Sequence, residues 1–523
     1  MLERAGVRWV FGVPSGPVLP LIEALRQSDT VDFVLTASET SAGFMAEAVG
    51  RLTGIPGVCV STVGPGATNL ATGVGGAFLD RSPMIAITCN YVRSQYGRRT
   101  QMYIDHQALF APLTKASYLV EEGHVAETLA RALGEAMTEP PGPIHLDFPE
   151  DVGVMEASES PLDAIVPAPA PPTPAGLSER IGFALRAAER PLVVTGLTIT
   201  RAKAPEALLK FIEKQQIPFV STLHAKGFLP DTHPAGLGVM GRARRTDVKR
   251  MIDQADLIIT VGFDPIEIDY EDWLGETPLV HLSTEPVEPG THATIAYQAT
   301  GDMDTMIAEL GALPVVENAW DRDSWADHRR TLHENLRPAS ANFATHQVLD
   351  VLRAELADDA VLTYDVGAHT HQIATQWQTD FPHTAVATNG WSSMGYGLPS
   401  AFAAKLARPD RQVVGVVGDG GFQMTVGELA TARRLGICVP IIVLNDGWLG
   451  LMKVKQERLG NPESASVLGE PLDPPAHYFG VPVRGVRDQA ELADAIKWAL
   501  SLEGPSVIET FVDVEPYSKT VFD

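Results

Sequence analysis

Short runs of apolar and β-branched residues recur through the first third of the chain, and stretches with helical spacing separate them. The runs are RWVFGVP (8–14), FVLTAS (33–38), GVCVSTV (57–63), PMIAITCN (83–90) and PIHLDFP (143–149). Between two of them, SAGFMAEAVGRLTG (41–54) has apolar residues at helical intervals and ends in glycine. Strands and helices that alternate in this way predict a parallel sheet with helices on both faces.

The same alternation occurs twice more further along the chain. The second series contains ERIGFALRAAERPLVVTG (179–196), IPFVSTL (217–223), ADLIITVGFDP (255–265), PLVHLSTEP (278–286) and YQATGD (297–302). The third contains AVLTYDVG (360–367), QVVGVVGDGG (412–421), VPIIVLNDG (439–447) and PSVIETFVD (505–513). We therefore predict an α/β protein built from three doubly wound parallel-sheet domains.

Changes in composition suggest where the domains begin and end. The stretch from Glu159 to Ser178 is rich in proline and alanine and lacks a helical period, so we expect an extended linker. DSWADHRRTLHENLR (323–337) has helical spacing between the second and third series. The predicted organisation is an N-terminal domain, a linker, a central domain, a connecting helical segment and a C-terminal domain, at residues 1–158, 159–177, 178–315, 316–340 and 341–523.

Charge and cysteine content narrow the possible partners and the compartment. The chain has 40 Lys and Arg against 65 Asp and Glu, a net charge of −25, which disfavours binding to nucleic acid or to an anionic membrane. No apolar run reaches the roughly 18–20 residues of a membrane span. Cys59, Cys89 and Cys438 each lie in an apolar run, which predicts buried thiols in a reducing, cytoplasmic setting. The first residues have the pattern of a helix–strand unit, so we expect no signal peptide.

One loop of the third series has the composition of a phosphate site. The strand VVGVV is followed by GDGG, in which Gly418, Gly420 and Gly421 allow the backbone to turn tightly and to approach a ligand. FQMTVGELATARRLG (422–436) is expected to form a helix directly after this loop. Because the N-terminus of a helix favours anions, the loop is a candidate diphosphate site.

Two acidic residues are expected to meet at this loop. Asp446 follows Asp419 by 27 positions, and one helix and one strand fit between them. Both residues would then lie at the ends of adjacent strands. Carboxylate and phosphate oxygens are the ligands that Mg²⁺ prefers. The predicted metal ligands are Asp419, Asp446 and the backbone carbonyl of Trp448, together with two diphosphate oxygens and a water.

The GDG motif followed at this interval by NDG resembles the metal–diphosphate motif of thiamine diphosphate (ThDP) enzymes. In that family the second site is usually a pair of asparagines, of which the second binds the metal. Asp446 occupies that second place here, and Asn445 remains the alternative ligand.

The resemblance extends to the N-terminal series. LTASETSAGFMAEAVGRLTG, GPGATN and FGVPSGPVLPLIEAL resemble segments of acetolactate synthase-like members of the family. The resemblance implies a pyrimidine-binding, a central and a diphosphate-binding domain. It also implies that Glu39 is the catalytic glutamate, which hydrogen-bonds the aminopyrimidine of ThDP and promotes loss of the proton at its thiazolium C2. Family members place the glutamate of one subunit against the diphosphate domain of another, so we expect a homodimer or homotetramer.

Further site residues follow from the same resemblance. NGWSSMGYGLPSA matches the segment that keeps the cofactor folded, with Met394 beneath the ring and the Ser392 carbonyl at the amino group. TYDVGAHTHQIATQW matches a segment that contacts the diphosphate through Gly367, Ala368 and His369. Substrate-facing candidates are Gln101, His106, Gln107 and Lys455.

Two departures bear on the reaction. The segment ADLIITVGFDPIEIDYEDW lacks an arginine that the biosynthetic members carry, and LMKVKQE places Lys455 where those members have tryptophan. The chain therefore resembles the catabolic, FAD-independent type more, and FAD is not expected. We predict a ThDP- and Mg²⁺-dependent carboligase or lyase for a small 2-keto acid or aldehyde, nearest to acetolactate formation from pyruvate. A 2-keto acid decarboxylase and a non-catalytic ThDP-fold binding protein are the alternatives.

Overall fold

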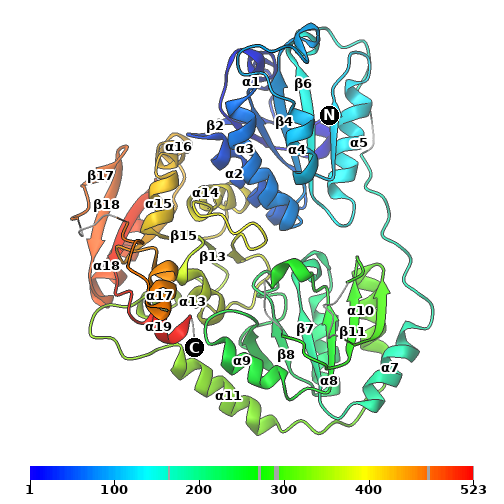
Figure 1. Ribbon diagram of the computed structural model, residues 1–523, viewed down its shortest axis with the longest axis vertical. Coiled ribbons are helices and arrows are strands. Elements are labelled where there is room, and N and C mark those ends of the chain that lie inside the picture. The colour runs from blue at the N-terminus through cyan, green and yellow to red at the C-terminus, as the bar shows by residue number, and fades with distance from the viewer. Residues whose placement is uncertain (163–164, 269–272, 288–293, 468–471, 522–523) are drawn as a thin grey trace.

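The computed structural model describes residues 1–523 except 163–164, 269–272, 288–293, 468–471 and 522–523. It contains three α/β units, each built on its own sheet (Figure 1). In the described part of the chain the sheets have six, six and seven strands, and every strand pair is parallel except one. The expected architecture of three parallel-sheet domains is therefore confirmed.

Five strands of the N-terminal sheet coincide with the five apolar runs that the sequence pattern indicates. Its strand order is β2 (Asp32–Leu35), β1 (Trp9–Gly12), β3 (Gly57–Ser61), β4 (Met84–Asn90), β6 (Pro143–Pro149) and β5 (Ala116–Leu119). The helices α2 (Glu39–Thr53), α3 (Pro65–Leu79) and α5 (Val125–Met137) connect its strands. The edge strand β5 was not expected, because its four residues are all only partly buried and give no apolar run.

The central sheet has the same plan, with six parallel strands between helices. Its order is β12 (Ile295–Thr300), β11 (Leu279–Ser283), β10 (Leu257–Val261), β7 (Pro191–Thr195), β8 (Phe219–Ser221) and β9 (Gly236–Val239). The covering helices include α7 (Leu177–Ala187), α8 (Pro205–Gln215) and α10 (Met303–Ala312). The chain reaches α7 through a segment along one side of the molecule (Figure 1), and residues 165–174 of it form neither helix nor strand.

The C-terminal sheet holds the loop singled out by the sequence. Its order is β14 (Ala385–Val386), β13 (Val361–Tyr364), β15 (Val413–Gly418), β16 (Pro440–Asn445), β19 (Ser506–Phe511), β18 (Val481–Val486) and β17 (His477–Tyr478). β15 and β16 are almost wholly buried, which explains their continuous apolar runs. The short pair β17–β18 is antiparallel and had no recognisable pattern in the sequence. The helix α11 (Arg322–Asn335) precedes this domain.

The single helix expected from Phe422 to Gly436 is instead two helices, and the first begins at Asp419, so Gly420 and Gly421 lie in its first turn rather than in a loop; we keep the name glycine loop for residues 418–421. α15 (Asp419–Thr425) ends before Gly427, and α16 (Glu428–Leu435) begins directly after it. The buried Glu428 carboxylate accepts hydrogen bonds from the backbone N–H groups of Ala37 and Ser38, at 2.9 and 3.1 Å. A Cβ at Gly427 would lie 3.2 Å from Ala37 Cβ. The break therefore brings the start of α16 against the N-terminal domain.

The N- and C-terminal domains share one hydrophobic core. Residues of α2 and of α14 (Gly397–Ala407) belong to the same buried cluster, in which the rings of Phe44 and Tyr396 pack edge to face with centroids 5.6 Å apart. The Tyr396 hydroxyl donates a 2.5 Å hydrogen bond to the Glu47 carboxylate, which is also buried. The two domains are thus tightly packed within one chain.

Two of the three cysteines lie where the pattern places them. Cys59 and Cys89 are buried in β3 and β4, and burial raises the pKa of both thiols. Cys438 is only half-buried, because it lies in the loop before β16 rather than in the strand, so the prediction of a buried thiol was wrong there. Among the described residues, no helix combines the length and apolar character that a membrane crossing needs.

Candidate cofactor and metal site

Three segments meet where neighbouring strands of the C-terminal sheet end. β13 pairs with β15, and β15 pairs with β16 so that Gly418 lies opposite Leu444. The residues after these strands are therefore neighbours, as the spacing of Asp419 and Asp446 predicted. In open α/β sheets this carboxyl edge is where ligands bind.

The glycines at this edge are positions where a side chain does not fit. A Cβ at Gly421 would lie 1.7 Å from Asp365 Oδ2, and one at Gly420 would lie 2.8 Å from a methyl carbon of Leu449 and 3.2 Å from Met394 Cε. A Cβ at Gly418 would lie 3.0 Å from the ring of His369. The GDGG loop is thus enclosed by the segments that hold Met394 and His369, which the resemblance had assigned to the same cofactor.

The carboxylates of Asp419 and Asp446 are close enough to interact electrostatically. Asp419 is 5% exposed, and its two oxygens accept hydrogen bonds from Gly420 N at 2.9 Å and Gly447 N at 3.0 Å. Burial raises the pKa of Asp419 to about 6. Burial and the charge of Asp419 raise the pKa of Asp446 to about 8. Carboxylates that repel each other in this way are stabilised by a divalent cation between them.

The backbone turn after β16 separates the roles of Asn445 and Asp446. Asn445 is buried, and its side-chain amide donates a 2.8 Å hydrogen bond to Glu509 Oε1 in β19. Asp446 is half-buried, and its Oδ1 accepts a 2.8 Å hydrogen bond from Trp448 N, which orders the loop. This geometry favours Asp446 as the metal ligand, with Asn445 holding the strand.

His369 is the clearest sign that a ligand belongs at this edge. It lies in the first turn of α13 (Ala368–Gln376) and is 6% exposed, and burial lowers its pKa to about 4. Within the described residues its Nε2 has no hydrogen-bond partner. A buried polar atom without a partner is costly, so a phosphate oxygen bound here would satisfy it when the ring carries its proton on Nε2.

Met394 lies in the loop before α14, half-buried against the glycine loop. Two residues earlier, Ser392 is exposed and has a φ of 51°, in the left-handed region that non-glycine residues seldom adopt. Its hydroxyl donates a 2.5 Å hydrogen bond to the Asn389 carbonyl. The loop is held in one conformation although its tip is exposed.

Glu39 begins α2 in the N-terminal domain. Ser38 caps this helix by accepting a 3.2 Å hydrogen bond from Ser41 N, and Glu39 occupies the first turn with an exposed fraction of 9%. Asn69 donates a 3.1 Å hydrogen bond to Glu39 Oε2, and a Cβ at Gly66 would lie 3.2 Å from Oε1. Both residues come from GPGATN, so that motif positions the glutamate. The motif is recognisable in the sequence, but this role of Asn69 was not predicted from it.

The substrate candidates differ in their accessibility. Gln101 is exposed and Gln107 is half-buried. His106 is 1% exposed; its Nε2 accepts a 3.2 Å hydrogen bond from Gly64 N, and its Nδ1 lies 2.8 Å from Thr88 Oγ1. His106 is thus fully occupied within its own domain. Lys455 is exposed on α17 (Gly450–Leu459).

Together these residues fit a diphosphate and a divalent cation. Gly418, Gly420 and Gly421 pack where no side chain fits, His369 Nε2 has no hydrogen-bond partner among the described residues, and the charge of Asp419 raises the pKa of Asp446. The N-terminus of α13 lies beside these glycines, since His369 in its first turn packs against Gly418, and it favours negative charge. The structure brings together Gly367, Ala368, His369, Met394, Gly418–Gly421 and Asp446, whereas Glu39 lies on the other domain.

Family models of thiamine pyrophosphate enzymes match the chain in three places, thiamine pyrophosphate (TPP) being another name for ThDP. The N-terminal TPP binding domain matches residues 1–109, the central domain residues 179–310 and the C-terminal TPP binding domain residues 365–510. The fold, the site and these matches define an enzyme of the ThDP-dependent class.

Similar proteins narrow the class further. A probable acetolactate synthase large subunit of Methanocaldococcus jannaschii is 31% identical over 98% of this chain and 90% of its own length. The acetolactate synthase isozyme 1 large subunit of Escherichia coli is 32% identical, over 98% and 93%. The acetolactate synthase of Bacillus subtilis is 33% identical, over 98% and 92%. The chain belongs to the acetolactate synthase-like family of ThDP enzymes.

Proposed function

We propose that this protein is a ThDP- and Mg²⁺-dependent carboligase that joins two molecules of a small 2-keto acid, with pyruvate conversion to acetolactate and CO₂ as the nearest reaction. The observation that supports this most is the convergence of His369, Met394, the glycine loop and two acidic residues at one sheet edge. The names of the similar proteins support the choice of pyruvate.

Each residue has a role that its surroundings support. Asp419 and Asp446, with the carbonyl of Trp448, would hold Mg²⁺, while the glycine loop and the first turn of α13 would hold the diphosphate. ThDP, when bound, supplies a carbon nucleophile and accepts the electrons released with CO₂. Met394 would keep the cofactor folded, and Glu39, fixed by Asn69, would hold a proton at the pyrimidine ring.

Carboligation is preferred over simple decarboxylation because the N-terminal domain offers no suitable acid among the candidates. A decarboxylase needs a polar group that protonates the product before a second keto acid arrives. His106 is unsuited to this, because both of its ring nitrogens are bonded within the domain. Gln101, which is exposed, is the candidate for contacting the substrate, and it carries no titratable proton.

We propose further that the protein is of the catabolic, FAD-independent type. Leu197 follows the carboxyl end of β7. Its backbone N–H donates a 2.7 Å hydrogen bond to Glu267 Oε2. Glu267 is 3% exposed, and a Cβ at Gly196 would already touch it at 2.8 Å. A buried carboxylate at the place where a doubly wound sheet binds a dinucleotide diphosphate would repel that group.

The test is product analysis with pyruvate, ThDP and Mg²⁺ and no added FAD. We expect acetolactate as the main product, at a rate that added FAD does not change. Acetaldehyde as the main product would support a decarboxylase instead. If neither product forms and ThDP still binds, the protein is a binding protein or acts on another keto acid, which the same assay with longer 2-keto acids and aldehydes resolves.

We also propose that the active site forms between two subunits of a homodimer or homotetramer. Within one chain, the described contacts of the Glu39 side chain are with the N-terminal domain, and none joins it to Asp419 or Asp446. A second copy would bring its own Glu39 to this edge. The N- and C-terminal domains of one chain already pack against each other through a shared hydrophobic core. The contact with a second copy would therefore be a different interface.

Mixed dimers test this arrangement. One subunit would carry Glu39→Gln and the other Asp419→Ala, each with its own affinity tag, so that only the mixed species is purified. Shared sites predict about half of the wild-type activity per dimer, because one of the two sites then has both residues intact. Sites contained within single chains predict no activity, since each chain would lack one residue.

A further inference from the structure

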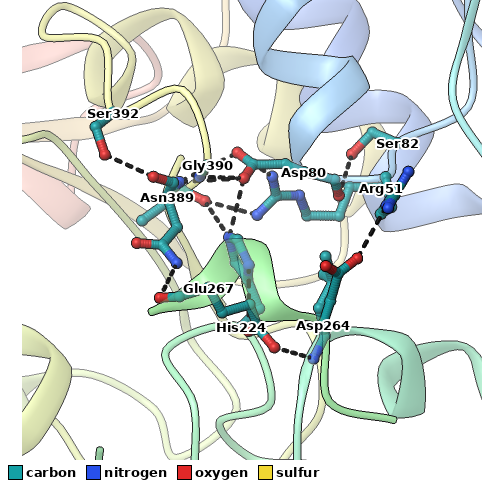
Figure 2. A network of polar contacts seen from close by, with 12 residues as sticks. Arg51, Asp80, Ser82, His224, Asp264, Glu267, Asn389, Gly390 and Ser392 are labelled. Atoms are coloured by element: carbon teal, nitrogen blue, oxygen red, sulfur yellow. Dashed lines mark hydrogen bonds and ion pairs between the residues drawn. The ribbon is translucent and has the colours of Figure 1, made fainter. Parts of the chain in front are cut away.

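Residues 389–396, in the loop between β14 and α14, hold both Ser392 and Met394, and we name them the cofactor segment. Its tip is exposed at Trp391 and Ser392, yet both of its ends are buried in polar contacts. Figure 2 shows the contacts at its first end, where residues of all three domains meet. Such a loop needs an explanation for how its conformation is maintained.

Asp80 of the N-terminal domain holds the first end. It is 1% exposed and follows the last turn of α3. Its carboxylate accepts hydrogen bonds from Gly390 N at 2.7 Å and from Asn389 N at 3.2 Å (Figure 2). A Cβ at Gly390 would lie 2.6 Å from Leu79 Cβ, so the segment lies directly on the end of α3.

Arg51 and His224 favour the ionised form of Asp80. Burial alone would raise its pKa, but His224 of the central domain and Arg51 of α2 hold the pKa of Asp80 below its ordinary value. Arg51 Nη2 lies 3.1 Å from Asp80 Oδ2, and Arg51 Nη1 donates a 2.6 Å hydrogen bond to the Ala387 carbonyl just before the segment. His224 Nε2 donates to the same carbonyl at 3.1 Å. The backbone that leads into the segment is therefore held by residues of the N-terminal and central domains.

Asp365 holds the second end. It follows β13 and is fully buried. Its oxygens accept hydrogen bonds from Gly395 N at 3.0 Å and Tyr396 N at 3.2 Å, the residues directly after Met394. The same carboxylate abuts Gly421 of the diphosphate loop. Asp365 therefore fixes the distance between the Met394 backbone and the glycine loop.

We infer that Asp80 and Asp365 are positioning residues that clamp the cofactor segment at both ends and so set the place of Met394 against ThDP. The inference rests on the proposed function. Each carboxylate accepts from two consecutive backbone N–H groups, which a neutral amide with a single acceptor oxygen does not reproduce. Asp80 also makes the N-terminal domain part of the cofactor site of its own chain, separately from the role of Glu39 toward a second subunit.

The test compares Asp80→Asn and Asp365→Asn with the wild type. We expect the apparent KM for ThDP to rise about tenfold or more, because a charge-assisted pair of hydrogen bonds is lost. We also expect kcat at saturating ThDP to fall several-fold and the circular dichroism signal of bound ThDP to change, while KM for pyruvate changes little. A purely structural role would instead lower the fraction of folded protein and leave the KM for ThDP unchanged.

Two further variants make the result decisive. Asp264→Asn removes an acidic partner of Arg81 at the same domain junction (2.9 Å) without touching the segment, and it should behave as the wild type. Gly390→Ala displaces the segment from Leu79 without removing a charge, and it should raise the KM for ThDP even if the aspartate variants fail to fold.

The outcomes separate this inference from the proposed function. Calorimetry with Mg²⁺ compares the ThDP affinity of the wild type with that of Asp80→Asn, Asp365→Asn and Gly390→Ala. If the wild type binds ThDP but no more tightly than these variants, the clamp alone is overturned, whether or not pyruvate is turned over. Wild-type protein that does not bind ThDP would overturn the proposed function and the clamp with it.

Discussion

Glu39→Gln is expected to lower kcat with pyruvate by at least about 100-fold, the usual contribution of a group that moves a proton, while ThDP affinity stays within about threefold. Glutamine keeps the size of the side chain and its hydrogen bond with Asn69, so cofactor binding should persist. It loses the charge that would hold a proton on the pyrimidine ring. The measurement is steady-state acetolactate formation together with calorimetric titration of ThDP in the presence of Mg²⁺.

A second glutamate in the same domain provides the control. Glu127 lies in the first turn of α5, as Glu39 lies in the first turn of α2, but its side chain is 77% exposed. Glu127→Gln should leave kcat and ThDP affinity unchanged. Full activity of Glu39→Gln would remove Glu39 from the mechanism, whereas loss of ThDP binding would show that Glu39 acts in binding rather than in proton transfer.

Asp419→Ala is expected to weaken Mg²⁺-dependent ThDP binding by at least about 100-fold. The substitution removes a metal ligand, and it also leaves Gly420 N and Gly447 N without the oxygens that order the loop. Calorimetric titration of ThDP with and without EDTA measures the effect: the wild type should lose binding when the metal is chelated, and Asp419→Ala should show weak binding in both conditions. Asp410→Ala, at an exposed position before β15, is the control and should bind as the wild type does.

Asp446 is expected to behave differently from Asp419. Asp446→Asn keeps an oxygen ligand and removes the repulsion that raises the pKa of Asp446, so ThDP binding should be retained. Asp446→Ala removes the oxygen and should weaken binding as strongly as Asp419→Ala. Normal Mg²⁺-dependent binding by Asp446→Ala would contradict this assignment and make Asn445 the better candidate.

The strands that hold the site were predictable because they are buried on both faces and therefore have unbroken apolar runs, as β15 and β16 do. The edge strands β5, β9 and β17 were not, because they are short or partly exposed. The break between α15 and α16 was also unpredictable. It depends on Glu428 reaching the backbone of Ala37, some 390 positions away in sequence.

The residues of the candidate site likewise fall into those that the sequence predicts and those that only the fold reveals. The GDGG loop and Asp446 are local signals, since spacing along adjacent strands fixes their neighbourhood. The roles of Asp80 and Glu267 could not be predicted, because each carboxylate accepts hydrogen bonds from the backbone of a distant segment that only the folded chain brings near. Asp365 lies within the motif TYDVGAHTHQIATQW, but its partners, Gly395 and Tyr396, are 30 and 31 positions away.

The proposed function requires that this chain binds ThDP and activates its C2 position. The most direct measurement is hydrogen–deuterium exchange at C2 of ThDP bound to the wild-type protein with Mg²⁺, followed by quenching and NMR. We expect exchange much faster than in free ThDP at the same pH, with the acceleration lost in Glu39→Gln. Exchange no faster than in free ThDP would contradict it.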